Sequence, residues 1–128
     1  MSILAVTRGD TVNLRAVFTD LGDPPVDLGA ATTKLRFTVK RNPADSDDQA
    51  LISISSEDGR FTITGTTTLD WTIRPDEYEL MGAIKQLTKF VHDLQITDEA
   101  TDPPRVYTIP ESGSAAFIVH PDVRQGTP

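Results

Sequence analysis

Apolar residues recur at every second position in four separate stretches of this chain, which are residues 12–18, 35–39, 69–73 and 90–96. Successive side chains of a β-strand point to opposite faces of the sheet, so this alternation predicts strands with one buried and one solvated side. One hairpin and three shorter apolar runs bring the expected number of strands to about nine, the runs being residues 3–6, 106–109 and 115–119. Strands at a spacing of about 8–12 residues predict a sandwich or a barrel.

The hairpin is expected between Ala50 and Thr64. Asp58-Gly59 would form its two-residue tip, because both residue types tolerate the positive φ angles that such a turn requires. This register sets Ile54 opposite Ile63 and Ser56 opposite Phe61. It also brings four apolar side chains to one face, which are those of Ile52, Ile54, Phe61 and Ile63.

One segment, from Asp76 to Leu87, departs from the strand period and predicts a short helix or a pair of turns. Asp76 can cap a first turn, and Glu79 lies three residues further on, as in a capping box. Gly82 makes a long continuous helix unfavourable. Three apolar residues would lie on one helical stripe, namely Leu80, Ile84 and Leu87.

Length and composition restrict the class of protein. The 128 residues suit one domain, expected over residues 1–120, followed by a flexible tail over 121–128. Because the chain has no cysteine, disulfides, thiol catalysis, iron–sulfur clusters and cysteine zinc sites are excluded. The net charge of −7 argues against direct nucleic-acid binding, which needs a basic surface. With no signal-peptide pattern and no membrane-spanning apolar stretch, we expect a soluble protein made in the cytoplasm.

Few residues suggest chemistry, and for each the structural interpretation is favoured. His92 lies on the apolar face of a strand and His120 at a strand end, without further ligands at zinc spacing. The acidic run at 45–48 could attract calcium but lacks the EF-hand order, so a solvated loop is expected. Arg8-Gly9-Asp10 spells an integrin tripeptide but sits where a turn is needed. Asp93 is expected to bond backbone amides or face water. The sequence therefore predicts no catalytic, cofactor-binding or metal site.

The aromatic residues bear on an alternative function, a carbohydrate-binding or host-adhesion module. Such modules present exposed rings, and this chain has five Phe, two Tyr and one Trp. Trp71 alternates with Leu69 and Ile73, so it is expected on the buried face, whereas the pattern does not place Tyr78 and Tyr107. A hydrolase with clustered carboxylates is a third class, and it would need two acids facing one cleft.

The order of several short motifs resembles the small immunoglobulin-like domains of tailed bacteriophages, and is similar to the N-terminal domain of the baseplate upper protein. The resemblance covers roughly Thr7 to Val119. Its motifs are residues 7–11 (TRGDT), 26–30 (VDLGA), 35–40 (LRFTVK), 58–59 (DG), the segment 76–87 and 92–96 (HDLQI).

The resemblance implies an immunoglobulin-like antiparallel β-sandwich of about nine strands with one short helix. It also implies a non-enzymatic virion protein of the tail, baseplate, neck or capsid surface. Its partners would be other virion structural proteins and copies of itself in a symmetric oligomer or array, with no contact to nucleic acid or membrane. We expect the partner contacts at the terminal segments, Met1–Val6 and Pro121–Pro128.

Overall fold

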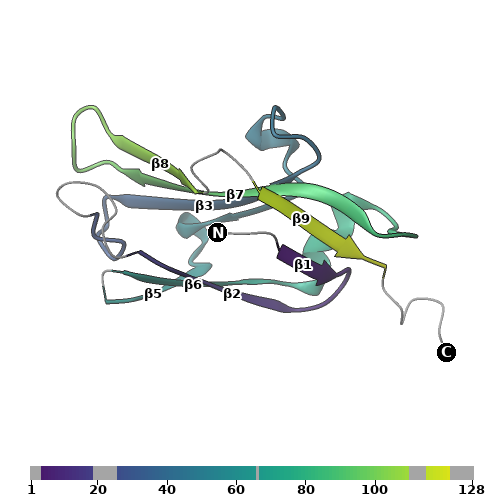
Figure 1. The fold of residues 1–128 in the computed structure, drawn as a ribbon. Coiled ribbons are helices and arrows are strands. Elements are labelled where there is room, and N and C mark those ends of the chain that lie inside the picture. The colour runs from purple at the N-terminus through teal and green to yellow at the C-terminus, as the bar shows by residue number, and fades with distance from the viewer. Residues whose placement is uncertain (1–3, 19–25, 66, 110–114, 122–128) are drawn as a thin grey trace.

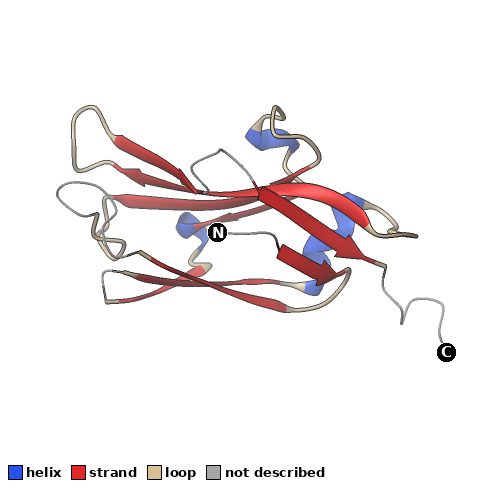
Figure 2. Cartoon of the chain, in the orientation of Figure 1, coloured by secondary structure: helices blue, strands red, loops and turns tan. Residues whose placement is uncertain are grey.

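The computed structural model describes residues 4–18, 26–65, 67–109 and 115–121 of the chain (Figure 1). In these residues, nine strands form two sheets that lie face to face, as the alternation predicted. The strands are β1 (Leu4–Thr7), β2 (Val12–Val17), β3 (Thr33–Lys40), β4 (Ile52–Ser55), β5 (Phe61–Thr64), β6 (Thr68–Ile73), β7 (Thr88–Asp98), β8 (Arg105–Ile109) and β9 (Ala115–His120). Three short 3-10 segments lie in the connections between strands (Figure 2).

The sheet order confirms an immunoglobulin-like β-sandwich. The larger sheet runs β1-β9-β7-β3-β4, and the smaller sheet runs β2-β6-β5. A sheet with β3, β7 and β9 that faces a sheet with β2, β6 and β5 is comparable with the two-sheet architecture of immunoglobulin-like domains, although β1 joins the larger sheet. The long strand β7 has β3 on one side, while its other side is shared by β9 along its first half and β8 along its second half. The antiparallel expectation holds for every pair except one, because β1 runs parallel to β9.

The core forms where alternate residues of the two sheets meet. Phe37 of the larger sheet and Trp71 of the smaller sheet are both buried, and their ring centroids lie 5.3 Å apart. Phe61 of the smaller sheet also contacts the indole, and the two ring centroids lie 5.5 Å apart. Tilted aromatic pairs at this separation are favourable beyond the apolar area that they bury. The prediction that Trp71 belongs to the buried face is therefore confirmed.

The predicted hairpin between Ala50 and Thr64 is wrong. Its first strand, β4, pairs with β3, and its second strand, β5, pairs with β6 in the opposite sheet. The connection is the 3-10 turn η2 (Ser56–Asp58), in which the Ser55 hydroxyl accepts a hydrogen bond from the Glu57 amide. Gly59 ends the turn with a φ of 68°, so the glycine has the predicted conformation in a different kind of connection.

The apolar pattern allowed this error because it does not specify a pairing partner. Ile54 of β4 and Ile63 of β5 both direct their side chains toward the same core, one from each sheet. In the structure Ile54 lies opposite Phe37, and Ile63 lies opposite Leu69. Pairing with the longer strands β3 and β6 adds each short strand to a sheet with a buried face, whereas an isolated two-stranded hairpin is only marginally stable.

The helix expected between Asp76 and Leu87 is the 3-10 segment η3 (Pro75–Met81). Glu77, rather than Glu79, closes its first turn, because its carboxylate accepts a 2.7 Å hydrogen bond from the Arg74 amide. The buried residues are Tyr78 and Met81, three apart, as the 3.0-residue turn of a 3-10 helix requires.

The stripe expected from an α-helical period is accordingly wrong. Leu80 and Leu87 are 69% and 55% exposed, and only Ile84 is buried. Gly82, with a φ of 72°, ends the segment, consistent with the predicted break at this residue.

Candidate functional site

Polar side chains on the outer faces of both sheets are largely bound to one another across strands. On the smaller sheet, Arg15 donates to Asp70 at 2.7 Å, and the Thr72 hydroxyl donates to the Asn13 side chain at 2.8 Å. Such cross-strand pairs stabilise a sheet and keep its outer face polar. These groups therefore serve the fold.

Asp93 lies on the outer face of β7, opposite Thr38 of β3. The Thr38 hydroxyl donates to the Asp93 carboxylate at 2.9 Å, and Thr38 itself is buried. Asp93 therefore forms a cross-strand pair with a hydroxyl group, where we expected backbone amides or water as its partners.

The two histidines lie at opposite ends of β9, His92 opposite its first residue and His120 at its last. His92 is only 1% exposed and packs between two core rings, with centroid distances of 5.8 Å to Phe37 and 6.1 Å to Phe117. His120 is exposed at the end of β9, while His92 lies opposite Ala115 at the start of that strand. His92 and Asp93 point to opposite faces of β7, so they do not converge on one cleft.

The acidic run at residues 45–48 forms a loop closed by the 3-10 turn η1 (Asp47–Gln49). Asp47 accepts hydrogen bonds from Lys40 at 2.9 Å and from Arg36 at 3.5 Å, and the bond from Lys40 holds the pKa of Asp47 below its ordinary value. Asp45 accepts from the Asn42 amide. In the part of the chain that the structure describes, no group of three or more potential ligands is placed to hold a metal ion.

The Arg8-Gly9-Asp10 tripeptide is a turn between β1 and β2, as predicted. Gly9 has a φ of 89°, and the Asp10 amide donates to the Thr7 carbonyl at 3.0 Å. The turn is fastened to η3, because Arg8 donates to the Gly82 carbonyl at 2.8 Å and the Tyr78 hydroxyl donates to the Asp10 carbonyl at 3.0 Å. Burial raises the pKa of Tyr78 to about 12.

All eight aromatic residues lie in described segments, and none belongs to the exposed residues. Five are buried, namely Phe37, Trp71, Tyr78, Phe90 and Phe117, and three are half-buried, namely Phe18, Phe61 and Tyr107. The Arg105 guanidinium lies over the Tyr107 ring, 6.0 Å from its centroid. The ring platform typical of carbohydrate-binding modules is therefore not formed by these side chains.

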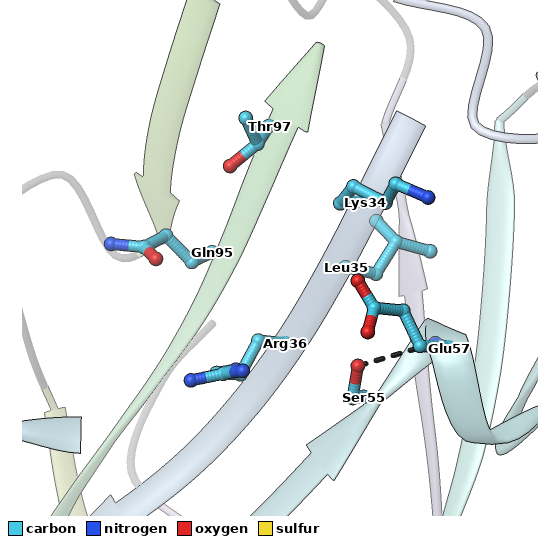
Figure 3. A pocket seen from close by; sticks show the side chains of 7 residues that line it. All are labelled: Lys34, Leu35, Arg36, Ser55, Glu57, Gln95 and Thr97. Atoms are coloured by element: carbon cyan, nitrogen blue, oxygen red, sulfur yellow. Dashed lines mark hydrogen bonds between the residues drawn. The ribbon is translucent and has the colours of Figure 1, made fainter. Parts of the chain in front are cut away.

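A shallow polar depression lies on the outer face of the larger sheet, at β3, β7 and the end of β4 (Figure 3). It encloses about 180 Å³, which is less than the roughly 300 Å³ at which small-molecule pockets begin. Glu57 is its single carboxylate, and its carboxylate points back toward Leu35 in Figure 3. The depression is lined by Lys34, Leu35, Arg36, Ser55, Glu57, Gln95 and Thr97.

A second depression, which we call the β4–η3 groove, lies between the start of β4 and the segment η3. It encloses about 200 Å³ and is lined by Leu51, Ile52, Ser53, Asp76, Glu77, Glu79 and Leu80. Its composition combines a strand edge, three carboxylates and one exposed leucine. Sequence reasoning missed it because β4 was assigned to the wrong partner, although the acidic run ending in Leu80 was visible.

Glu77 anchors the η3 wall of this groove. Its two carboxylate oxygens accept hydrogen bonds from Arg60 at 2.7 and 3.0 Å, and both side chains are only about 15% exposed. Arg60 also donates to the Thr72 carbonyl at 2.7 Å. Burial opposes the ionised form of Glu77, but the hydrogen bonds from Arg60 and the Arg74 amide outweigh it, so the pKa of Glu77 is lowered.

Comparison with known proteins adds no relative. No protein-family model matches the sequence, and no curated protein matches it either. Among the described residues, no helix has the length and apolar character needed to cross a bilayer. The resemblance to phage immunoglobulin-like domains therefore stays a prediction that rests on the motifs.

Proposed function

We propose that this chain is a non-enzymatic structural subunit of a tailed-bacteriophage virion, in the tail, baseplate, neck or capsid surface. It acts by contacting other virion proteins and further copies of itself. The observation that carries the proposal is the immunoglobulin-like sandwich, with its nine strands in the two sheets that the phage resemblance implies. Since a fold alone does not specify a function, the motif resemblance is the second support.

The strand edges of the sandwich support a role in protein–protein contact. Among the described strands, β1, β4 and β8 of the larger sheet and β2 and β5 of the smaller sheet each have a partner on one side only. Edge strands direct unpaired N–H and C=O groups outward, where another chain can add a strand. Repetition of such a contact by symmetry gives a ring or an array.

The terminal segments that we expected to contact partners have different structural settings. Residues 4–7 of the N-terminal segment form β1, and Val6 is buried against the core, so this part belongs to the sandwich. Beyond Pro121, the C-terminal segment lies outside the described residues. The partner contact proposed for the last eight residues stays a prediction.

The burial of the aromatic residues favours this role over the alternative, a sugar-binding module. A glycan array is the direct comparison, and reproducible binding of one glycan class would favour adhesion. One observation bears on the third class, a hydrolase, because three carboxylates line the β4–η3 groove. Two others disfavour it, since Glu77 is paired with Arg60 and the groove is smaller than an ordinary substrate pocket.

Particle purification tests the proposal. Phage particles from cells that encode the chain are banded on a density gradient and washed at high salt, and the protein is detected with an antibody. We expect it to sediment with the major capsid protein and to resist the wash. A chain without its last eight residues should fold normally but enter particles poorly. Recovery of the full-length chain only at the top of the gradient would overturn the proposal.

A further inference from the structure

We propose that the β4–η3 groove binds an extended segment of a partner protein that carries both basic and apolar side chains. The segment would add as a further strand along the free edge of β4. This inference deepens the proposed function and rests on it, since it gives the chemistry of the virion partner. The evidence comes from the backbone edge, the charge around it and one exposed leucine.

The edge of β4 is well suited to receive a strand. Among the described strands β4 pairs only with β3, and the pairing is extended by the Leu51 amide, which donates to the Val39 carbonyl at 2.7 Å. Residues 50–55 (ALISIS) contain no proline and no charge. Prolines and charged residues commonly protect the edge strands of natural proteins against pairing with another chain. The edge strand β2, for comparison, carries the exposed Arg15.

Carboxylates flank this edge at both of its ends. Asp76 and Glu79 stand at the start of β4 in the groove, and Glu57 and Asp58 stand in η2 at its end. All four are exposed, and none forms an ion pair with a described residue.

Four cations lie close to these carboxylates. At the end of β4, Lys34 and Arg36 line the outer depression together with Glu57. At the start of β4, Arg60 pairs with Glu77, and the exposed Arg74 offsets only part of the charge of Asp76 and Glu79. The start of the edge therefore has an excess of negative charge, which favours a segment with Lys or Arg side chains.

Leu80 supplies the apolar contact. Its side chain is 69% exposed at the wall of the groove, next to the buried Leu51 and Ile52. Because Asp76, Glu79 and Leu80 line the same groove, a segment that carries both basic and apolar side chains can contact the carboxylates and the leucine together. The groove is shallow and open along the strand, which suits an extended chain better than an enclosed small molecule.

A peptide-binding experiment tests the inference with the full chain. The probe is a fluorescent peptide, acetyl-Val-Arg-Val-Arg-Val-Arg-amide, followed by anisotropy. Its controls are the same peptide with Glu in place of Arg and one N-methylated at every amide, which leaves neither edge able to donate a hydrogen bond. We expect binding of the first peptide only. Hydrogen exchange should slow over residues 51–55 when this peptide binds, because strand addition protects the edge amides.

Substitutions separate this groove from general charge attraction. Asp76→Lys with Glu79→Lys should weaken binding by about tenfold, and Leu80→Ser by about fivefold. The matched control is Glu99→Lys, which reverses an exposed acid in the β7–β8 turn and should change binding by less than about twofold. All four positions are exposed, so the variants should melt like the wild type.

Three results would overturn the inference: an equal loss in the Glu99→Lys variant, unchanged binding of the N-methylated peptide, or protection outside β4. The proposed virion role fails separately. If the Asp76→Lys/Glu79→Lys chain enters particles as the wild type does, the groove is not the contact, while the structural role stands. If the wild-type chain is missing from particles, the virion role is wrong whatever the peptide does.

Discussion

Replacing Arg60 with methionine should strongly destabilise the protein, because it leaves the Glu77 carboxylate between β6 and η3 without its positively charged partner. In the wild type, Arg60 donates two hydrogen bonds to Glu77 and one to the Thr72 carbonyl, at 2.7 to 3.0 Å. Both charged side chains are only about 15% exposed. In the variant, Glu77 keeps its bond from the Arg74 amide but loses its counter-charge.

The size of the effect follows from this geometry. Removing one partner of a buried ion pair lowers the free energy of unfolding by about 3–5 kcal/mol, and the partial exposure of this pair indicates the lower end, about 3 kcal/mol. A chain of 128 residues has an unfolding entropy near its melting temperature of about 0.27 kcal/mol/K. The melting temperature should therefore fall by about 11 °C. The exposed Arg15→Met variant is the matched control and should melt nearly as the wild type does.

The pH dependence gives a second test with a defined sign. The pKa of Glu77 is lowered in the folded protein, so its contribution is present above the ordinary glutamate value and is lost as the pH falls through the folded value. In the variant without Arg60, burial dominates and raises the pKa of Glu77. Protonation of Glu77 then removes the unpaired charge and so reduces the loss of stability. The stability difference, measured by urea unfolding, should be largest at neutral pH. It should shrink as the pH falls through the raised pKa of the variant, above the ordinary glutamate value of about 4.3, and shrink further as the pH falls through the lowered pKa of the wild type.

The double variant Arg60→Met/Glu77→Leu completes the cycle. It should recover most of the loss, because apolar residues of similar size can replace a buried pair. A loss below about 1 kcal/mol in Arg60→Met, or one that does not depend on pH, would refute the role assigned to this pair.

Three further predictions concern the core. Ile54→Ala should lower the free energy of unfolding in urea by about 3 kcal/mol, because the side chain is fully buried. Val106→Ala, at a 56% exposed position, should lower it little. Equal losses in the two variants would contradict the assignment of Ile54 to the core. In a Tyr107→Phe background, absorbance titration of Tyr78 should give a pKa of about 12, with stability falling as the pH rises above about 10, and a midpoint near 10 would contradict its burial. Trp71, the single tryptophan, should emit at short wavelength and resist iodide quenching, and ready quenching would contradict its position.

The strands and the buried residues could be predicted from the sequence because alternation reports directly on burial. Leu35, Phe37 and Val39 of β3 are all buried, as are Leu69, Trp71 and Ile73 of β6. Each of these sets depends only on which face of a strand is dry. The histidine on an apolar face and the glycine in the Arg8-Gly9-Asp10 turn follow from the same local reasoning.

The pairing partners could not be predicted in the same way. Asp58-Gly59 fits a hairpin tip, but Gly59 also fits the end of a turn that carries the chain to the other sheet. Because β4 and β5 face one core from opposite sides, the apolar pattern is satisfied either way. Competition from the longer strands β3 and β6 decides the outcome, and that is a tertiary effect.

The candidate groove depends on that tertiary outcome, so it was beyond sequence reasoning. An α-helical period placed Leu80 on a buried stripe, whereas the 3-10 period buries Tyr78 and Met81 and leaves Leu80 exposed. The carboxylates beside it were visible as an acidic run. Only the position of β4 at the sheet edge gives them a strand to flank.

The number of copies per particle tests the structural role most directly. Quantitative mass spectrometry of gradient-purified virions measures this chain against the major capsid protein. We expect a fixed ratio that is the same in independent preparations and matches the symmetry of one substructure, since virion subunits repeat by symmetry. Trace amounts that vary between preparations, with most of the chain left in the soluble fraction, would contradict it.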